Sequence, residues 1–283
     1  MNIPFGRGAI PWSDPIAREI TLQTFRPEAH RPDGPVVFVQ HGMQRNGDDY
    51  RDFWIEAAQR HAALIVAPTF SAAAFPGSES YNNGLVRDDA GAVRPRAEWA
   101  YGVPARVFAA LRDAGITTRE RARIFGHSAG SQFLHRMLSV MDGPWESPVC
   151  GNAGWYTLPD ASAPFPDGLG GTGVSDADLV RLLARDITIL AGDADTETNG
   201  PSVPSHAAAV AQGPHRFARA HAYLAAGRAE AARRGVPCNW RLVVVPGIGH
   251  DGHAMSVAAA ALWFEGQLPD AATLAARRGA VVA

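Results

Sequence analysis

Apolar residues along the chain follow two patterns, one typical of strands and one typical of helices. Residues 36–41 (VVFVQH) form a continuous apolar run, as expected for a strand that is covered on both faces, and residues 18–25 alternate with period two. Residues 48–62 instead carry apolar side chains at helical spacing after an acidic first turn. The beginning of the chain therefore predicts strands and helices in alternation.

The same alternation continues to the end of the chain. We predict strands at residues 18–25, 36–41, 64–68, 122–127, 148–154, 187–193 and 240–247. We predict helices at residues 48–62, 97–115 (with a kink or a restart at Pro104), 128–141, 176–186, 215–235 and 254–268. Strands that alternate with helices of ten or more residues fold into a mostly parallel sheet with helices on both faces. The predicted fold class is α/β.

Three connecting segments are longer and richer in Gly and Pro than simple crossovers require: residues 69–96, 155–175 and 194–214. Each follows a predicted strand, so all three are expected at the carboxyl-end edge of the sheet, where open α/β folds bind ligands. Loops of this length commonly act as lids or binding loops. No linker or internal repeat divides the sequence. We predict a single domain over residues 1–283, with these loops as the rim of its active site.

Composition excludes several classes of function. The 283 residues are 46% hydrophobic and 19% charged, and the formal charge of −2 provides no basic field for binding nucleic acid. No stretch reaches the ~18 apolar residues of a membrane span. The N-terminus has no apolar segment of signal-peptide length, and Pro4, Pro11 and Pro15 interrupt it. We therefore expect a cytoplasmic protein that acts on a small molecule, with Cys150 and Cys238 as free thiols.

Residues 126–130 (GHSAG) have the form G-x-S-x-G, and the position of this motif makes it informative. Ser128 lies directly after the predicted strand 122–127 and directly before a predicted helix. A sharp turn there exposes the hydroxyl above the sheet, and the glycines let the helix approach the strand closely. The helix N-terminus then presents N–H groups to a developing oxyanion. We predict that Ser128 is a nucleophile rather than the cap of a Gly-rich turn.

A serine nucleophile needs a histidine to take its proton and a carboxylate to orient that histidine. Of the ten histidines, His250 fits best because it follows the last predicted strand on a Gly-flanked loop. His253 is its local rival, with a cap or surface role as the alternative. The carboxylate is expected at another strand end, where Asp193 and Asp195 stand, and we favour Asp195 for its reach. No third metal ligand accompanies the histidines, so we expect neither a metal nor a cofactor.

Backbone N–H groups are expected to complete the site. The dipeptide His41-Gly42 ends an early predicted strand, and a turn at Gly42 would aim the N–H of Met43 at the site, opposite the N–H of Ala129. A simple strand-to-helix turn is the alternative for this segment.

Aromatic and histidine side chains near the motifs receive separate predictions. Trp155 and Tyr156 follow a predicted strand and are candidates for binding substrate, with core packing as the alternative. His127 adjoins the serine in sequence and is expected to point away from it, and His135 is expected in the core or a groove.

The predicted parts occur in the order oxyanion hole, serine, aspartate, histidine, each just after a strand, and this order resembles the α/β-hydrolase fold. The resemblance covers residues 18–268. Within them, GHSAGSQFLHR, GNAGWYTLPD and VVVPGIGHDGH are similar to the esterase and polyhydroxybutyrate-depolymerase-like branch. The resemblance implies Ser128 as nucleophile, His250 as base and Asp195 as its partner.

These observations predict a serine hydrolase that cleaves carboxylic esters of small molecules through an acyl-enzyme. An amidase or peptidase of the same fold is one alternative. A catalytically idle hydrolase fold that acts as a ligand receptor is the other, and it would be expected to lack one of the three reactive side chains.

Overall fold

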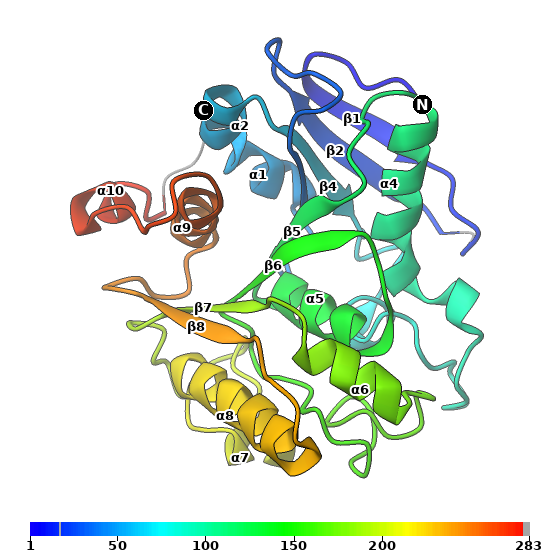
Figure 1. The fold of residues 1–283 in the computed structure, drawn as a ribbon, viewed down its shortest axis with the longest axis vertical. Coiled ribbons are helices and arrows are strands. Elements are labelled where there is room, and N and C mark those ends of the chain that lie inside the picture. The colour runs from blue at the N-terminus through cyan, green and yellow to red at the C-terminus, as the bar shows by residue number, and fades with distance from the viewer. Residues whose placement is uncertain (17, 280–283) are drawn as a thin grey trace.

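Within residues 1–16 and 18–279, which the computed structural model describes, eight strands form one sheet through the centre of the protein (Figure 1). The strands are β1 (Gly6–Trp12), β2 (Ile20–Arg26), β3 (Val36–Gln40), β4 (Leu64–Thr69), β5 (Ala122–His127), β6 (Trp145–Gly151), β7 (Thr188–Gly192) and β8 (Arg241–Val245). Their order across the sheet is β1-β2-β4-β3-β5-β6-β7-β8. Residues 17 and 280–283, which the single-domain prediction includes, lie outside the described part.

The direction of the strands confirms the predicted mostly parallel sheet. Strands β4, β3, β5, β6, β7 and β8 are parallel to one another, whereas β1 pairs with β2, and β2 with β4, in antiparallel fashion. All seven predicted strands are present within a few residues of their expected bounds. The carboxyl ends of the parallel strands therefore meet at one edge, where the predicted site residues lie.

Strand β1 was not predicted, because the prolines near the N-terminus obscure it. Pro11 lies opposite Thr21 in the register of β1 with β2. An edge strand tolerates proline, since its missing N–H can face away from the partner strand. The side chains of β1 are partly or fully exposed in alternation, so no buried apolar run marks it in the sequence.

Helices cover both faces of the sheet, as predicted (Figure 1). The helices are α1 (Gly47–Asp52), α2 (Ile55–His61), α3 (Gly77–Ser80), α4 (Val103–Asp113), α5 (Ala129–Val140), α6 (Asp176–Leu183), α7 (Ala207–Ala211), α8 (Arg216–Arg234), α9 (Gly252–Phe264) and α10 (Ala271–Ala275). Short 3-10 turns, η1 (Arg96–Glu98) and η2 (Ala100–Gly102), precede α4. None of the helices within the described residues is long and apolar enough to cross a membrane.

Alternate side chains of the strands fill two separate cores. Val36 and Phe38 of β3 belong to the core that lies under α4, α5, α6 and α8. Val37 and Val39 belong to the core under α1, α2 and α9. Each such fully buried side chain contributes about 1.5–3 kcal/mol relative to an exposed one. The continuous apolar run of β3 thus reflects two covered faces.

Two predicted helices differ from expectation. The helix predicted at residues 48–62 is two short helices, α1 and α2, because the chain makes a tight turn through Phe53 and Trp54 between them. The helix predicted at 97–115 begins at Val103, so Pro104 marks a start. Proline fits the first turn of a helix, where its missing N–H would have no intrahelical partner.

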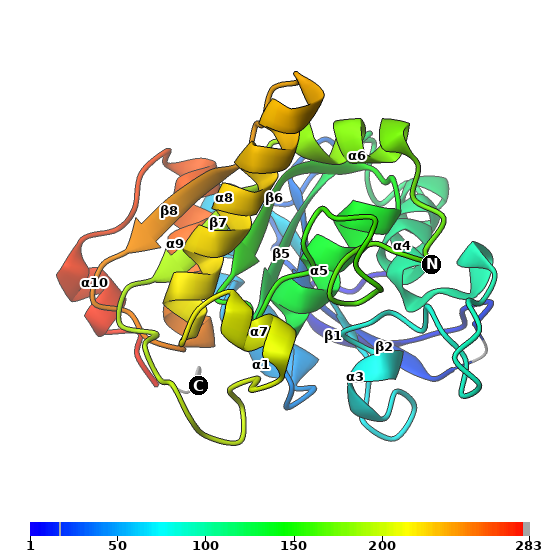
Figure 2. The same cartoon turned by 90° about the horizontal axis from the view of Figure 1, so that it is seen from below.

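The three long loops contact one another beside the sheet, and the short helices α3 and α7 lie within them (Figure 2). Arg96 Nη2 donates to the carbonyl of Gly173 (3.0 Å) and links the end of the first loop to the second. The Gln212 amide exchanges two hydrogen bonds with the backbone of Tyr156 and links the third loop to the second. These segments are therefore held in place by hydrogen bonds despite their length.

Helix α5 approaches the sheet so closely that two positions require glycine. A Cβ on Gly126 would lie 2.3 Å from the Gly130 carbonyl oxygen, and a Cβ on Gly130 would lie 2.1 Å from that of Gln40. Real Cβ atoms do not approach a backbone oxygen this closely. The two glycines of the G-x-S-x-G motif thus set the distance between α5 and strands β3 and β5.

We expect Gly130→Ala to destabilise the protein by about 1–3 kcal/mol, because α5 must move away from the Gln40 carbonyl. Urea denaturation measures this loss. Gly151→Ala is the matched control, since its Cβ would meet a carbon of the Phe125 ring at 3.3 Å, a contact that a small shift relieves. A smaller loss for Gly130→Ala than for Gly151→Ala would contradict the proposed packing constraint.

Candidate active site

Ser128 occupies a strained turn between β5 and α5. Its backbone angles are φ 57° and ψ −118°, a left-handed conformation that residues other than glycine rarely adopt. Such a conformation costs about 1–3 kcal/mol and persists because the surrounding structure imposes it. Ser128 itself is half-buried, so its hydroxyl remains accessible.

Three side chains from three different strand ends form a continuous hydrogen-bonded chain. Ser128 Oγ lies 2.9 Å from Nε2 of His250, which stands in the loop between β8 and α9. Nδ1 of the same imidazole lies 2.7 Å from Oδ2 of Asp195, which follows β7. The Asp195 side chain is 1% exposed and that of His250 is 27% exposed. The structure thus brings together the three residues that the sequence singled out.

Asp193, the alternative acid, has a different partner. Its Oδ1 accepts a hydrogen bond from the backbone N–H of Gly247 (2.6 Å), and the residue is exposed. Asn152, which the sequence analysis missed, joins the same two loops. Its side chain accepts from the Gly192 N–H and donates to the Gly249 carbonyl, both at 2.9 Å. A polar residue directly after a buried strand was the signal for Asn152.

His41 fixes the orientation of the peptide between Gly42 and Met43. Its Nε2 accepts from the Phe70 N–H (3.0 Å), so its proton is on Nδ1, which donates to the Gly42 carbonyl (2.9 Å). In a trans peptide the N–H points opposite to the C=O. The Met43 N–H therefore faces away from His41. A Cβ on Gly42 would lie 3.9 Å from that of Ser128, so this loop borders the serine.

Ala129 supplies the second predicted N–H group. It is the first residue of α5 and is buried, so its N–H belongs to the helix end that has no intrahelical acceptor. Met43, by contrast, carries a side chain that is 59% exposed. Ala129 follows the serine in the chain, and Met43 follows Gly42, which borders the serine.

His127, which was expected to point away from Ser128, contacts two other rings. Its ring lies 4.8 Å from that of His250, and its Nδ1 accepts from the hydroxyl of Tyr50 (2.7 Å). The Tyr50 hydroxyl also borders Gly42, since a Cβ on Gly42 would lie 3.1 Å from the hydroxyl oxygen. Burial lowers the pKa of His127 well below 6.5, as do the charges of His250 and Arg216, so His127 stays neutral. Sequence spacing gave no sign of Tyr50, because 77 residues separate it from its partner.

Trp155 and Tyr156, the predicted substrate-binding pair, lie mainly in the interior. Tyr156 is fully buried, with its ring stacked 4.5 Å from that of Tyr223. Trp155 is 8% exposed and lies between the guanidinium of Arg136, 4.5 Å from its ring, and the edge of His206. Tyr156 therefore occupies the core position that was its alternative, whereas Trp155 retains a small accessible surface.

Similar solved structures identify the fold family. At 54% identity, the chain matches LpqC, a poly(3-hydroxybutyrate) depolymerase from Bordetella parapertussis, over 96% of this chain and 95% of that one, with a TM-score of 0.94. The chain belongs to the α/β-hydrolase family. Within the family it lies in the depolymerase-like branch that the sequence motifs indicated. No family model matches the chain, and no curated protein matches it.

Two further structures extend the comparison. Poly(aspartic acid) hydrolase-1 from Sphingomonas sp. KT-1 is 34% identical over 92% of this chain and 99% of that one, with a TM-score of 0.90. An S-formylglutathione hydrolase from Agrobacterium tumefaciens is 17% identical over 98% of both chains, with a TM-score of 0.58, and shares the fold. The structures similar to this α/β-hydrolase are thus hydrolases that act on different substrates.

The other histidines of the motifs serve the packing of the hydrolase. His253, the rival of His250, is buried and stacks on Phe53 with ring centroids 4.8 Å apart, and Asp251 caps α9, so the expected cap or surface role is wrong. His135 is fully buried and accepts from the Thr157 N–H (2.9 Å), as the expectation of a core residue requires.

Among residues 1–16 and 18–279, no three His, Cys, Asp or Glu side chains are grouped so that they could hold a metal ion. Cys150 and Cys238 are free thiols, the first buried and the second half-buried.

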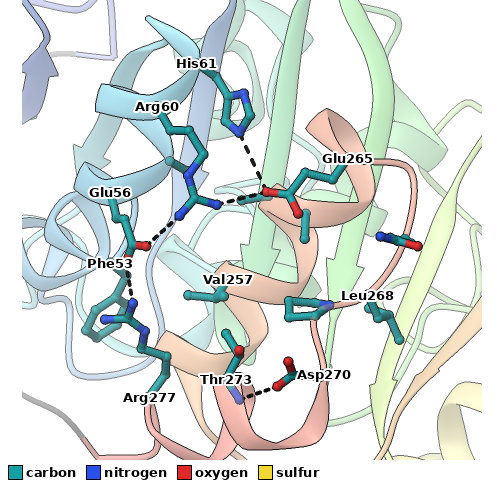
Figure 3. Close-up of a pocket in the computed structure, with 15 residues that line it drawn as sticks. Phe53, Glu56, Arg60, His61, Val257, Glu265, Leu268, Asp270, Thr273 and Arg277 are labelled. Atoms are coloured by element: carbon teal, nitrogen blue, oxygen red, sulfur yellow. Dashed lines mark hydrogen bonds and ion pairs between the residues drawn. The ribbon is translucent and has the colours of Figure 1, made fainter.

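A groove of about 550 Å³ lies apart from the three hydrogen-bonded side chains, between α2, α9 and α10 (Figure 3). Phe53 and Val257 are among its apolar lining. At its edge Arg60 bonds to Glu56 (2.9 Å) and to Glu265 (3.0 Å), and Arg277 also bonds to Glu56, so two arginines balance two glutamates. Neither the serine, the imidazole nor the carboxylate of the site lines this groove.

The buried histidines make stability depend on pH. Burial lowers the pKa of His41 to about 3 and lowers those of His127 and His135 well below 6.5. Below pH 6.5 the unfolded chain therefore binds protons that the folded chain does not, and stability falls as the pH falls. Each histidine contributes up to about 1.4 kcal/mol per pH unit.

We expect urea denaturation to give a lower free energy of unfolding at pH 5.5 than at pH 7.5. Carboxylates with lowered pKa values add to this loss mainly at more acidic pH, because they titrate near pH 4 when unfolded. His135→Gln keeps an acceptor for the Thr157 N–H and should weaken the pH dependence by the contribution of one histidine, up to about 1.4 kcal/mol per pH unit. Equal free energies of unfolding at the two pH values would contradict the conclusion that these buried histidines stay neutral.

Proposed function

We propose that this chain is a serine hydrolase that cleaves carboxylic esters through an acyl-enzyme intermediate. The observation that carries the proposal is the chain of two hydrogen bonds, 2.9 Å from Ser128 Oγ to His250 Nε2 and 2.7 Å from His250 Nδ1 to Asp195 Oδ2. A hydroxyl becomes nucleophilic when a base within hydrogen-bond reach takes its proton, and a carboxylate holds that base in the correct tautomer.

The proposed reaction has two stages. Ser128 Oγ bonds to the carbonyl carbon while its proton passes to His250 Nε2, and the Met43 and Ala129 N–H groups stabilise the oxyanion. Collapse of the tetrahedral intermediate expels the alcohol, which leaves with the proton from His250. Water then attacks the acyl-enzyme in the same manner, with His250 as base, and releases the acid. Asp195 stabilises the imidazolium at both stages.

The relatives support esters of 3-hydroxy acids as the first substrates to test. The relative at 54% identity is a depolymerase of poly(3-hydroxybutyrate), whose units are joined by ester bonds. Amide hydrolysis is the second candidate, because the relative at 34% identity acts on poly(aspartic acid), whose units are joined by amide bonds. Kinetics on 3-hydroxybutyrate oligomers, p-nitrophenyl esters and aspartyl oligomers compare these bonds directly, and a higher kcat/KM for the amides would overturn the ester proposal.

A ligand receptor without catalysis is the remaining alternative. A receptor has no need of an imidazole within bonding distance of a strained serine, and such strain is maintained at functional sites. A fluorophosphonate probe distinguishes the two functions, because it reacts covalently with an activated serine. Failure of the folded protein to react would favour the receptor.

We expect Ser128→Ala to lower kcat for ester hydrolysis by about 10⁴-fold or more while the protein remains folded, because removing one member disables the unit. Esterase assays and fluorophosphonate labelling measure the change, and a thermal melt checks folding. Activity near that of the wild type would exclude Ser128 as the nucleophile.

We expect Asp195→Asn to lower kcat by about 10⁴-fold, because an amide at this position favours the wrong tautomer of His250. Asp193→Asn is the matched control, since its side chain keeps an oxygen that accepts from the Gly247 N–H. Its kcat should stay close to that of the wild type. The opposite ranking of the two variants would identify Asp193 as the acid.

A further inference from the structure

A buried arginine holds the side of the Asp195 carboxylate that does not face His250. Arg216 is the first residue of α8, and its side chain is 1% exposed. Its Nη1 lies 3.2 Å from Asp195 Oδ1, whereas His250 Nδ1 binds Oδ2. The two oxygens of the carboxylate thus have separate partners on opposite sides.

Backbone contacts fix Arg216 in this position. Its Nη2 donates to the carbonyl (2.6 Å) and the hydroxyl (3.1 Å) of Ser202. The next residue of α8, Phe217, donates its N–H to the carbonyl of Asp195 (3.2 Å). The first two residues of α8 therefore form hydrogen bonds with both the side chain and the backbone of Asp195.

We propose that Arg216 is the positioning residue of this hydrolase site: it fixes the rotation of the Asp195 carboxylate, and its charge keeps His250 unprotonated, and thus active, at lower pH. This inference rests on the proposed function of the site. The guanidinium and the carboxylate are each 1% exposed, so water screens their charges little.

The sign of the effect follows from electrostatics. A cation close to an imidazole disfavours its protonated form. Arg216 also bonds the carboxylate that stabilises the imidazolium, which weakens that stabilisation. The general base must be unprotonated to accept the proton of Ser128, so the arginine extends activity toward acidic pH. Its charge also contributes to the lowered pKa of His127, after burial and the charge of His250.

Other charged and titratable groups stand around His250, and they are the same in wild type and variants. Glu197, which is 56% exposed, lies 4.0 Å from Arg216 and partly offsets its charge. Asp251 follows His250 directly and caps α9. The charged and titratable groups on the surrounding elements include Asp195, Arg216, Glu197, His127, Tyr50, Asp251 and Asp193, which bonds the loop of His250.

The experiment measures kcat/KM for a p-nitrophenyl ester across pH in the wild type, Arg216→Met and Arg216→Lys. We expect the acidic midpoint of the profile to rise by about one pH unit in the Met variant, because the cation is absent. The Lys variant retains the charge and should keep the wild-type midpoint with a lower kcat, since an ammonium lacks the planar fork that holds both Asp195 and Ser202.

Arg219→Met is the matched control. Arg219 lies on the same helix and is equally buried, but it donates to the carbonyls of Gly213 and Gly154 and bonds no carboxylate. Its loss should lower the melting temperature and leave the acidic midpoint unchanged. If Arg216→Met behaves like Arg219→Met, Arg216 is a structural residue and the inference is wrong.

Two measurements keep the test decisive. If Arg216→Met does not fold, Arg216→Gln replaces it, because glutamine retains a donor without the charge and should give the same upward shift. NMR titration of the His250 ring compares the midpoints in wild type and variant without relying on turnover. A higher midpoint by NMR in an enzyme that hydrolyses no ester would support the role of Arg216 and reject the proposed function; an unchanged midpoint would reject the role of Arg216 alone.

Discussion

Helix α5 begins where its backbone nearly touches strands β3 and β5, in a space that admits a hydrogen atom at Gly126 and Gly130 and nothing larger. The chain must reverse direction within one residue to enter this helix. Ser128 therefore adopts a left-handed conformation that presents its hydroxyl above the edge of the sheet. The packing of two apolar cores on either side of the sheet supplies the energy that maintains this strain.

Neutral imidazoles organise the groups around this turn. His41 orients the peptide before Met43, and His127 connects the turn to the Tyr50 hydroxyl, which borders Gly42. Burial keeps both rings uncharged, so each has one donor and one acceptor in fixed positions. The same burial that orders the site makes the folded state sensitive to acid.

The chain contains 26 arginines and no lysine. The planar guanidinium of arginine bonds several acceptors at once, which suits loops whose carbonyls have no regular partner. Arg219 binds the carbonyls of Gly213 and Gly154, and Arg136 joins Thr157 to Asn83. Arg216 bonds both the Ser202 carbonyl and the Asp195 carboxylate, so one side chain has a structural and an electrostatic role.

The sequence by itself determined the alternation of strands and helices, the α/β fold and the positions of Ser128, Asp195 and His250 at strand ends. These follow from local patterns: apolar period, flanking glycines and chain order. The tertiary structure alone decided which polar residues contact one another. Tyr50 and His127 are 77 residues apart, and β1 is defined by its pairing with β2. Such contacts depend on how helices and strands pack in space. The spacing of apolar residues along the sequence does not show which distant residues meet.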